Sequence, residues 1–112
     1  MDKNFVRLEG QVGDDLSYGR TQDGKDYGTF SLLLNGYSKE YHDSSERQHG
    51  FTMVRVMVFD VRLVERMRSL KVRSGTRVGL FARLNSHRTE YRGVSYIQND
   101  VVVRDLYVVK VS

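Results

Sequence analysis

Arginine and tyrosine side chains alternate around a single glycine in residues 88–96, RTEYRGVSY. A guanidinium group pairs with phosphate through two hydrogen bonds, and an aromatic ring stacks on a flat base. Arg88 and Arg92 are therefore candidate phosphate contacts. Tyr91 and Tyr96 are candidate stacking platforms for the bases of a nucleic-acid strand. The alternative is that these residues form an ordinary solvent-exposed hairpin turn, with the tyrosines supporting its base.

A second candidate set lies in residues 51–59, FTMVRVMVF. Successive side chains of a strand point to opposite faces, so the three valines form one face and leave a different set on the other. That other face carries Met53, Arg55, Met57 and Phe59. We expect the ring to stack on bases, the guanidinium to contact phosphate and the methionines to give adaptable apolar contact. The alternative is that this face packs against a neighbouring subunit.

Four further candidates lie outside these stretches. Tyr37 and Tyr41, in a polar segment, either stack on bases or lie on the surface without a ligand. Arg83 faces outward with Phe81 from a predicted strand. These two residues belong either to the nucleic-acid site or to an oligomer interface, and the pattern does not separate the alternatives.

Alternating apolar residues predict the strands that must position these side chains. The predicted strands are residues 4–12, 27–36, 51–59, 75–86 and 97–111. A helix should follow the third strand, with Asp60 as its N-cap and with Arg62, Arg66 and Arg68 facing water. Polar loops are expected at 36–50 and 86–96. This order predicts an all-β fold: a five-stranded Greek-key OB-fold barrel with one short helix between strands three and four.

Charge and composition narrow the class of protein. The chain has 112 residues, no cysteine and a net charge of +4. Residues 1–50 carry −3 and residues 51–112 carry +7, which is typical of a domain that binds a polyanion. The chain has no run near the roughly 18 apolar residues of a membrane span, and no signal-peptide core. We expect one domain, residues 1–112, in the reducing cytoplasm.

The residue pattern indicates neither catalysis nor a metal site. His42, His49 and His87 lack zinc-site spacing, and the chain has no cysteine. Asp14 and Asp15 are typical of a turn. No nucleophilic triad has supporting context, and no glycine-rich stretch matches a phosphate loop. We therefore expect a protein that is not an enzyme and uses no cofactor and no small-molecule substrate.

Three stretches resemble the bacterial single-stranded DNA-binding protein family. Residues 4–15, NFVRLEGQVGDD, follow an N-x-V-x-L-x-G-x-x-G-x-D pattern. Residues 23–35 resemble the family's glycine turn and second strand, and residues 54–78 resemble its third strand, helix and entry to strand four. The likeness covers about residues 4–109 and depends on the order and spacing of these stretches.

This resemblance implies an OB-fold that wraps single-stranded DNA as a homotetramer or homodimer in replication, recombination or repair. Phe59 and Arg55 match aromatic and basic positions of the family, and Tyr37 falls close to another aromatic position. Met53 stands where the family often has tryptophan, and Thr89 stands where another aromatic residue is common. Tyr91 and Tyr96 would compensate for the loss at Thr89.

The resemblance also suggests which type of family member this protein is. Many members end in a flexible tail with an acidic tip, whereas this chain ends in VVKVS. We therefore expect an accessory or mobile-element type. The alternatives are a primosomal or RNA-preferring OB module and an interaction domain that has lost its affinity for nucleic acid.

Overall fold

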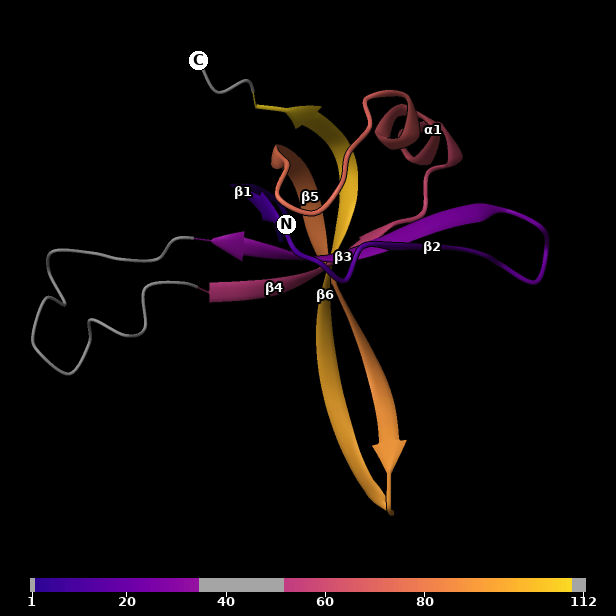
Figure 1. Ribbon diagram of the computed structural model, residues 1–112. Coiled ribbons are helices and arrows are strands. Elements are labelled where there is room, and N and C mark those ends of the chain that lie inside the picture. The colour runs from indigo at the N-terminus through magenta and orange to yellow at the C-terminus, as the bar shows by residue number, and fades with distance from the viewer. Residues whose placement is uncertain (1, 35–51, 110–112) are drawn as a thin grey trace, which may run out of the picture.

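The computed structural model describes residues 2–34 and 52–109 as six strands and one helix (Figure 1). The elements are β1 Val6–Val12, β2 Ser17–Arg20, β3 Asp26–Leu34, β4 Thr52–Val58, α1 Val61–Ser69, β5 Arg77–Tyr91 and β6 Val94–Val108. The helix lies between the third and fourth of the predicted strands, where the sequence pattern placed it.

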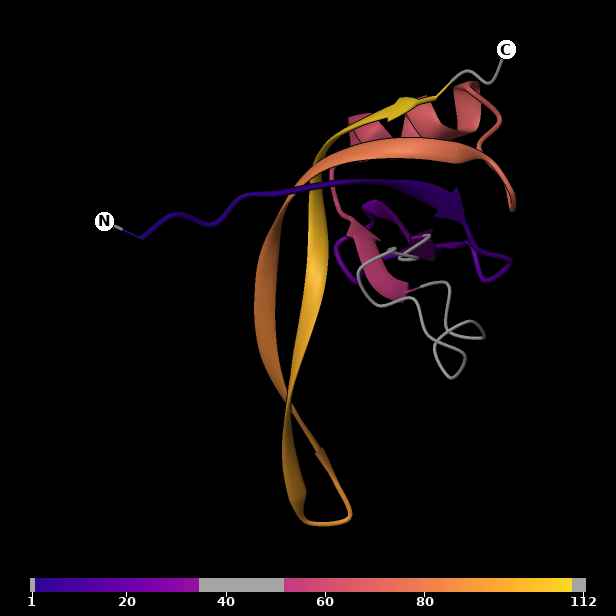
Figure 2. The same cartoon turned by 90° about the vertical axis from the view of Figure 1, so that its left-hand side faces the viewer.

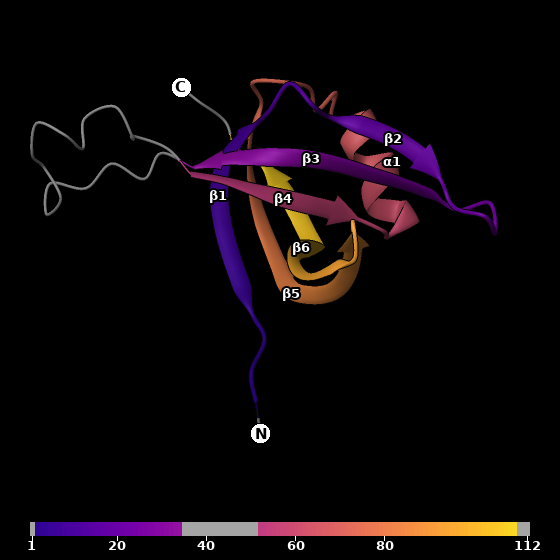
Figure 3. The same cartoon turned by 90° about the horizontal axis from the view of Figure 1, so that it is seen from below.

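Five of the strands close into a barrel. The order β1-β5-β6-β4-β3 is completed by a short antiparallel pairing of β1 with β3, and Figure 3 views this ring from below. Only β4 and β6 pair in parallel; the other strand pairs of the described chain are antiparallel. The predicted all-β Greek-key barrel with one helix is thereby confirmed.

Alternation along the strands fills the barrel with apolar side chains. Phe30 of β3 pairs with Val56 of β4, and both are buried. The helix adds three buried residues to the same core, Leu63, Val64 and Met67. Because these positions point inward, their neighbours along β3 and β4 must point outward and are available to bind a ligand.

The helix begins at the predicted residue. Asp60 is the N-cap, and its Oδ1 accepts a hydrogen bond from the backbone N–H of Arg62 at 2.9 Å. This bond satisfies one of the amides that an α-helix leaves without a partner in its first turn. The cap therefore sets where β4 ends and places Phe59 at the junction between strand and helix.

A short strand was not predicted from the sequence. β2 pairs with β3 from Ser17 opposite Thr29 to Arg20 opposite Asp26, around a turn that contains Gly24 at a φ of 84°. The sequence of β2, SYGR, is too short and too polar to show the alternation of a half-buried strand.

The predicted loop at residues 86–96 is wrong, because β5 and β6 continue through it as one long hairpin. Figure 2 shows this hairpin extending well beyond the barrel. Only Arg92 and Gly93 form the turn, with φ angles of 52° and 75°. Two positive φ angles define a type I′ turn, whose twist suits antiparallel strands. The hairpin therefore carries its side chains on two defined faces.

Candidate nucleic-acid interface

Outward-pointing residues of β3 and β4 form the first part of the candidate site. Met57 lies opposite Thr29, Arg55 opposite Ser31 and Met53 opposite Leu33. Met53 is 57% exposed, and Phe59, which follows β4, is 49% exposed. The Phe59 ring lies beside that of Tyr27, with 6.3 Å between ring centroids. Over residues 52–59, which the structure describes, the predicted division into an inner and an outer set is confirmed.

The same surface continues across β6 onto β5. Met57 pairs with Val102 of β6, and Val102 pairs on its other side with Arg83 of β5. Beyond Arg83, each second residue of β5 lies on this side of the hairpin. We call the combined surface the outer face; it comprises Met53, Arg55, Met57 and Phe59 with Arg83, Asn85, His87, Thr89, Tyr91, Tyr96, Asp100 and Val102.

The two tyrosines of the hairpin share the outer face. Thr89 pairs with Tyr96, and Tyr91 pairs with Val94, so the tyrosines are diagonal neighbours across the ladder. Tyr91 is 61% exposed and Tyr96 is 48% exposed. The Arg92 guanidinium lies 5.2 Å from the centroid of the Tyr91 ring. The two-residue turn keeps the strands in register up to the tip, and this register places both tyrosines on one face.

One of the described candidate residues does not join this group. Arg88 pairs with Ile97, and both residues lie on the opposite face of the hairpin from the tyrosines. The signal was present in the sequence, because Arg88 and Tyr91 are three residues apart and an odd spacing on a strand reverses the face. Tyr37, like Tyr41, lies outside the described residues.

The structure separates Arg83 from its neighbour Phe81. The Phe81 ring centroid lies 6.2 Å from that of Phe5 and 6.0 Å from that of Tyr107, with the Arg7 guanidinium 5.5 Å away. Phe81 is therefore part of an aromatic cluster beside β1, whereas Arg83 lies across β6 from Met57.

A buried acid on the outer face was missed by the sequence analysis. Asp100 is 8% exposed. Its Oδ1 lies 3.8 Å from Nε of Arg55, and its Oδ2 lies 3.3 Å from Nδ1 of His87. The other ring nitrogen of His87, Nε2, lies 3.0 Å from Oε1 of Gln98. Asp100 thus ties β4, β5 and β6 together and partly neutralises Arg55 at the middle of the face.

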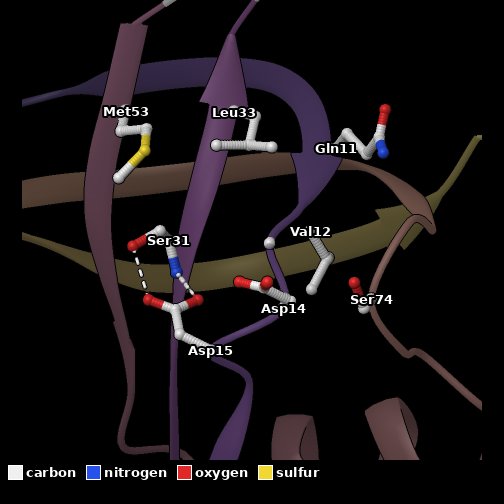
Figure 4. Close-up of a pocket in the computed structure, with 9 residues that line it drawn as sticks. Gln11, Val12, Asp14, Asp15, Ser31, Leu33, Met53 and Ser74 are labelled. Carbon is white, nitrogen blue, oxygen red and sulfur yellow. Dashed lines mark hydrogen bonds between the residues drawn. The ribbon is translucent and has the colours of Figure 1, made fainter.

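A recess opens where the outer face approaches β1. It has a volume of about 370 Å³ and is bounded in part by Gln11, Asp14, Leu33 and Met53 (Figure 4). Asp15 lies in its wall and accepts hydrogen bonds from Ser31 Oγ at 2.6 Å and Ser31 N at 2.8 Å. These bonds, the one from Oγ foremost, hold the pKa of the Asp15 carboxyl below its usual value.

The three arginines of α1 have partners within the protein. Arg66 Nη1 donates to Asp105 Oδ1 at 2.8 Å and to the Leu106 carbonyl at 3.1 Å. The Arg68 guanidinium lies 4.3 Å from the centroid of the Tyr18 ring. Arg62 Nε lies 3.7 Å from Asp60 Oδ1, and its side chain is 90% exposed. All three arginines are exposed, as predicted.

Residues 2–34 and 52–109 provide neither a metal site nor a membrane-spanning helix. No group of three histidine, cysteine, aspartate or glutamate side chains there is placed to hold a metal ion. No helix in this part of the chain is long and apolar enough to cross a membrane.

Comparisons with known proteins agree with the geometry. The model of the single-strand binding protein family matches residues 3–109. A Plasmodium falciparum single-strand binding protein in complex with single-stranded DNA superposes with a TM-score of 0.81, at 19% identity, over 98% of this chain and 97% of its own. A mitochondrial single-stranded DNA-binding protein of S. cerevisiae gives 0.71 at 16% identity, over 98% of each chain. At these identities the structural likeness concerns the fold. No curated protein matches the sequence.

Proposed function

The chain belongs to the single-strand binding protein family, and we propose that it holds single-stranded DNA along the outer face, with little regard to sequence at most positions. The observation that carries this proposal is the continuity of that face. It runs from Phe59 at the end of β4 across β6 to Tyr91 near the hairpin tip. Its exposed rings lie beside guanidinium groups. The rings can therefore stack on bases while the guanidinium groups contact the phosphates of the same DNA strand.

Stacking would be shared among several rings. Phe59, Tyr91 and Tyr96 offer exposed ring surface on the outer face, and Tyr37 is a further candidate. Met53 and Met57 would adapt to the base faces between these platforms. Every base has a flat face, so such contacts tolerate changes of sequence.

Phosphate contacts would come from arginine. Arg55 and Arg83 lie among the proposed stacking residues, and Arg92 occupies the turn of the hairpin. Arg88 would reach phosphate from the other face of the hairpin. These four residues belong to the basic half of the chain, which carries a net charge of +7.

Membership of the family supports an expectation for the oligomeric state, the compartment and the processes in which the protein acts. We expect the protein to work as a homodimer or homotetramer in the cytoplasm, in DNA replication, recombination or repair. Binding, not catalysis, is the activity of this family. Mass measurement in solution distinguishes a dimer from a tetramer.

Titration with poly-dT at two salt concentrations tests the proposal. Tyrosine emission should fall on binding, because bases stack on the rings and the chain has no tryptophan to obscure the signal. The slope of log K against log salt should be about −0.7 for each phosphate neutralised. Failure to bind poly-dT near 50 mM salt would contradict the proposal, and RNA and duplex competitors measure the preference for DNA.

Replacing Asp100 with asparagine should tighten binding. Asparagine keeps an oxygen that can accept a hydrogen bond from His87 but removes the charge that partly neutralises Arg55. We expect a gain of about 0.2–1 kcal/mol, the range of a surface ion pair, because the Arg55 side chain is 62% exposed although that of Asp100 is only 11% exposed. The salt slope should steepen by about 0.7, because Arg55 becomes free to neutralise one phosphate.

The matched control for this change is Asp23→Asn. Asp23 lies in the turn between β2 and β3, where Lys25 Nζ is 3.9 Å from its Oδ2, so the control also removes one charge from an ion pair. Its effect on affinity should be smaller and its salt slope unchanged. Weaker binding by Asp100→Asn would mean that Asp100 instead holds Arg55 in its productive position.

A further inference from the structure

The recess at the β1 end of the outer face has the size and position to receive part of a bound strand. Its volume of about 370 Å³ falls in the range of small-molecule sites, so one base can enter it. Leu33 of β3 pairs with Met53 on one side and with Gln11 of β1 on the other. The three residues form a row across three strands. A single-stranded DNA bound along β4 would therefore reach the recess without leaving the outer face.

The walls of the recess suit a flat heterocycle. Leu33 and Met53 supply apolar surface, and the Met53 side chain is 57% exposed. Asp14 and Gln11 supply polar groups at its boundary, with Ser74 on the loop that precedes β5. An apolar wall with a few polar groups is the usual composition of a site that fixes the orientation of a small ligand.

The two carboxylates of the recess have different tasks. Asp15 is engaged by the two hydrogen bonds from Ser31, which fasten the turn after β1 to β3. Asp14 is exposed and lines the recess between the Asp15–Ser31 pair and Val12 in the view of Figure 4. A carboxylate accepts hydrogen bonds and repels phosphate, so its natural partner in a nucleic-acid strand is an N–H group on a base edge.

We propose that this recess takes up one unstacked base of the bound strand and favours guanine over thymine. Guanine presents two adjacent N–H donors, from N1 and the 2-amino group, which match the two oxygens of Asp14. The amide of Gln11 can donate to the neighbouring O6. Thymine presents a single N–H group between two carbonyl oxygens, which the carboxylate repels. Unpaired bases are commonly read in this way on their Watson–Crick edges.

This inference rests on the proposed function and is tested with oligonucleotides that differ in one type of base. Tyrosine fluorescence is titrated with an oligo-dT and with the same oligomer carrying spaced guanines, too far apart to fold together. We expect the guanine oligomer to bind on the order of tenfold more tightly. Hypoxanthine in place of guanine removes only the 2-amino group, so the gain should fall sharply.

Variants assign the preference to the recess. Asp14→Asn should remove most of the preference for guanine, because an amide cannot accept from both donors. Asp23→Asn removes the same charge at the distant turn and should leave the ratio of the two affinities unchanged. Since both variants lower the negative charge by one, their general effect on DNA affinity cancels in this ratio.

Several results would overturn the inference. Equal affinity for the two oligomers would do so while leaving single-strand binding intact. A preference that persists with hypoxanthine, or in Asp14→Asn, would place the discrimination in ring stacking or elsewhere on the face. Absence of binding to oligo-dT itself would instead contradict the proposed function.

Discussion

Replacing Phe59 with alanine should weaken binding to poly-dT by about 1–3 kcal/mol, the usual contribution of one stack between a base and an aromatic ring. The Phe59 ring is 49% exposed and has the Tyr27 ring beside it, so it offers a platform that is partly held in place. The loss should appear in fluorescence titration at constant salt. It should leave the salt slope unchanged, because no cation has been removed.

Two controls test whether the outer face is the correct surface. Leu70 is 48% exposed, close to the exposed fraction of Phe59, but it lies at the C-terminal end of α1. Leu70→Ala should therefore leave the affinity almost unchanged, as should Arg62→Ala on the same helix. Arg66 is a poorer control, because its bonds to Asp105 and Leu106 fasten the helix to β6. Equal losses in the Phe59 and Leu70 variants would show that DNA binds elsewhere.

Replacing Phe30 with alanine should lower the free energy of unfolding by about 3–5 kcal/mol. Phe30 is 2% exposed, and its ring fills the barrel beside Val56. Its removal leaves a cavity that the surrounding strands cannot fill without breaking their register. Denaturant unfolding at one fixed protein concentration measures the loss, because an oligomer's stability depends on concentration.

Phe5→Ala is the matched control for this change. Phe5 has the same side chain as Phe30 but is 67% exposed, so its truncation to alanine removes much less packed apolar surface. Its substitution should cost much less than that of Phe30. Similar losses in both variants would mean that Phe5 is buried by another copy of the chain, and the measured mass of the Phe5 variant would then decrease.

Most of the fold could be predicted from the sequence, because each barrel strand carries its own alternation. Residues 51–59 show this directly: the valines lie inside, and Met53 and Phe59 lie on the outer face. The start of the helix was equally predictable, because the N-cap Asp60 accepts a hydrogen bond from Arg62, only two residues further along the chain. The strand β2 was not predicted because four residues, one of them glycine, are too few to show an alternation.

The site was predictable only in part. Residue types and spacing identified Phe59, Arg55 and the two tyrosines as candidates. They could not show that Asp100, 45 residues beyond Arg55, lies 3.8 Å from it. They also could not show the recess, which forms only where Gln11, Leu33 and Met53 meet across three strands.

The sequence by itself therefore determined the strand faces, the helix start and the kinds of side chain available, since these depend on neighbours within a few residues. Only the tertiary structure decided which of those side chains share one surface. Closure of the barrel aligns β4 with β6, and the two-residue turn at Arg92 and Gly93 keeps β5 in register with β6 far beyond the barrel. Both arrangements depend on pairings between distant residues, which no local pattern specifies.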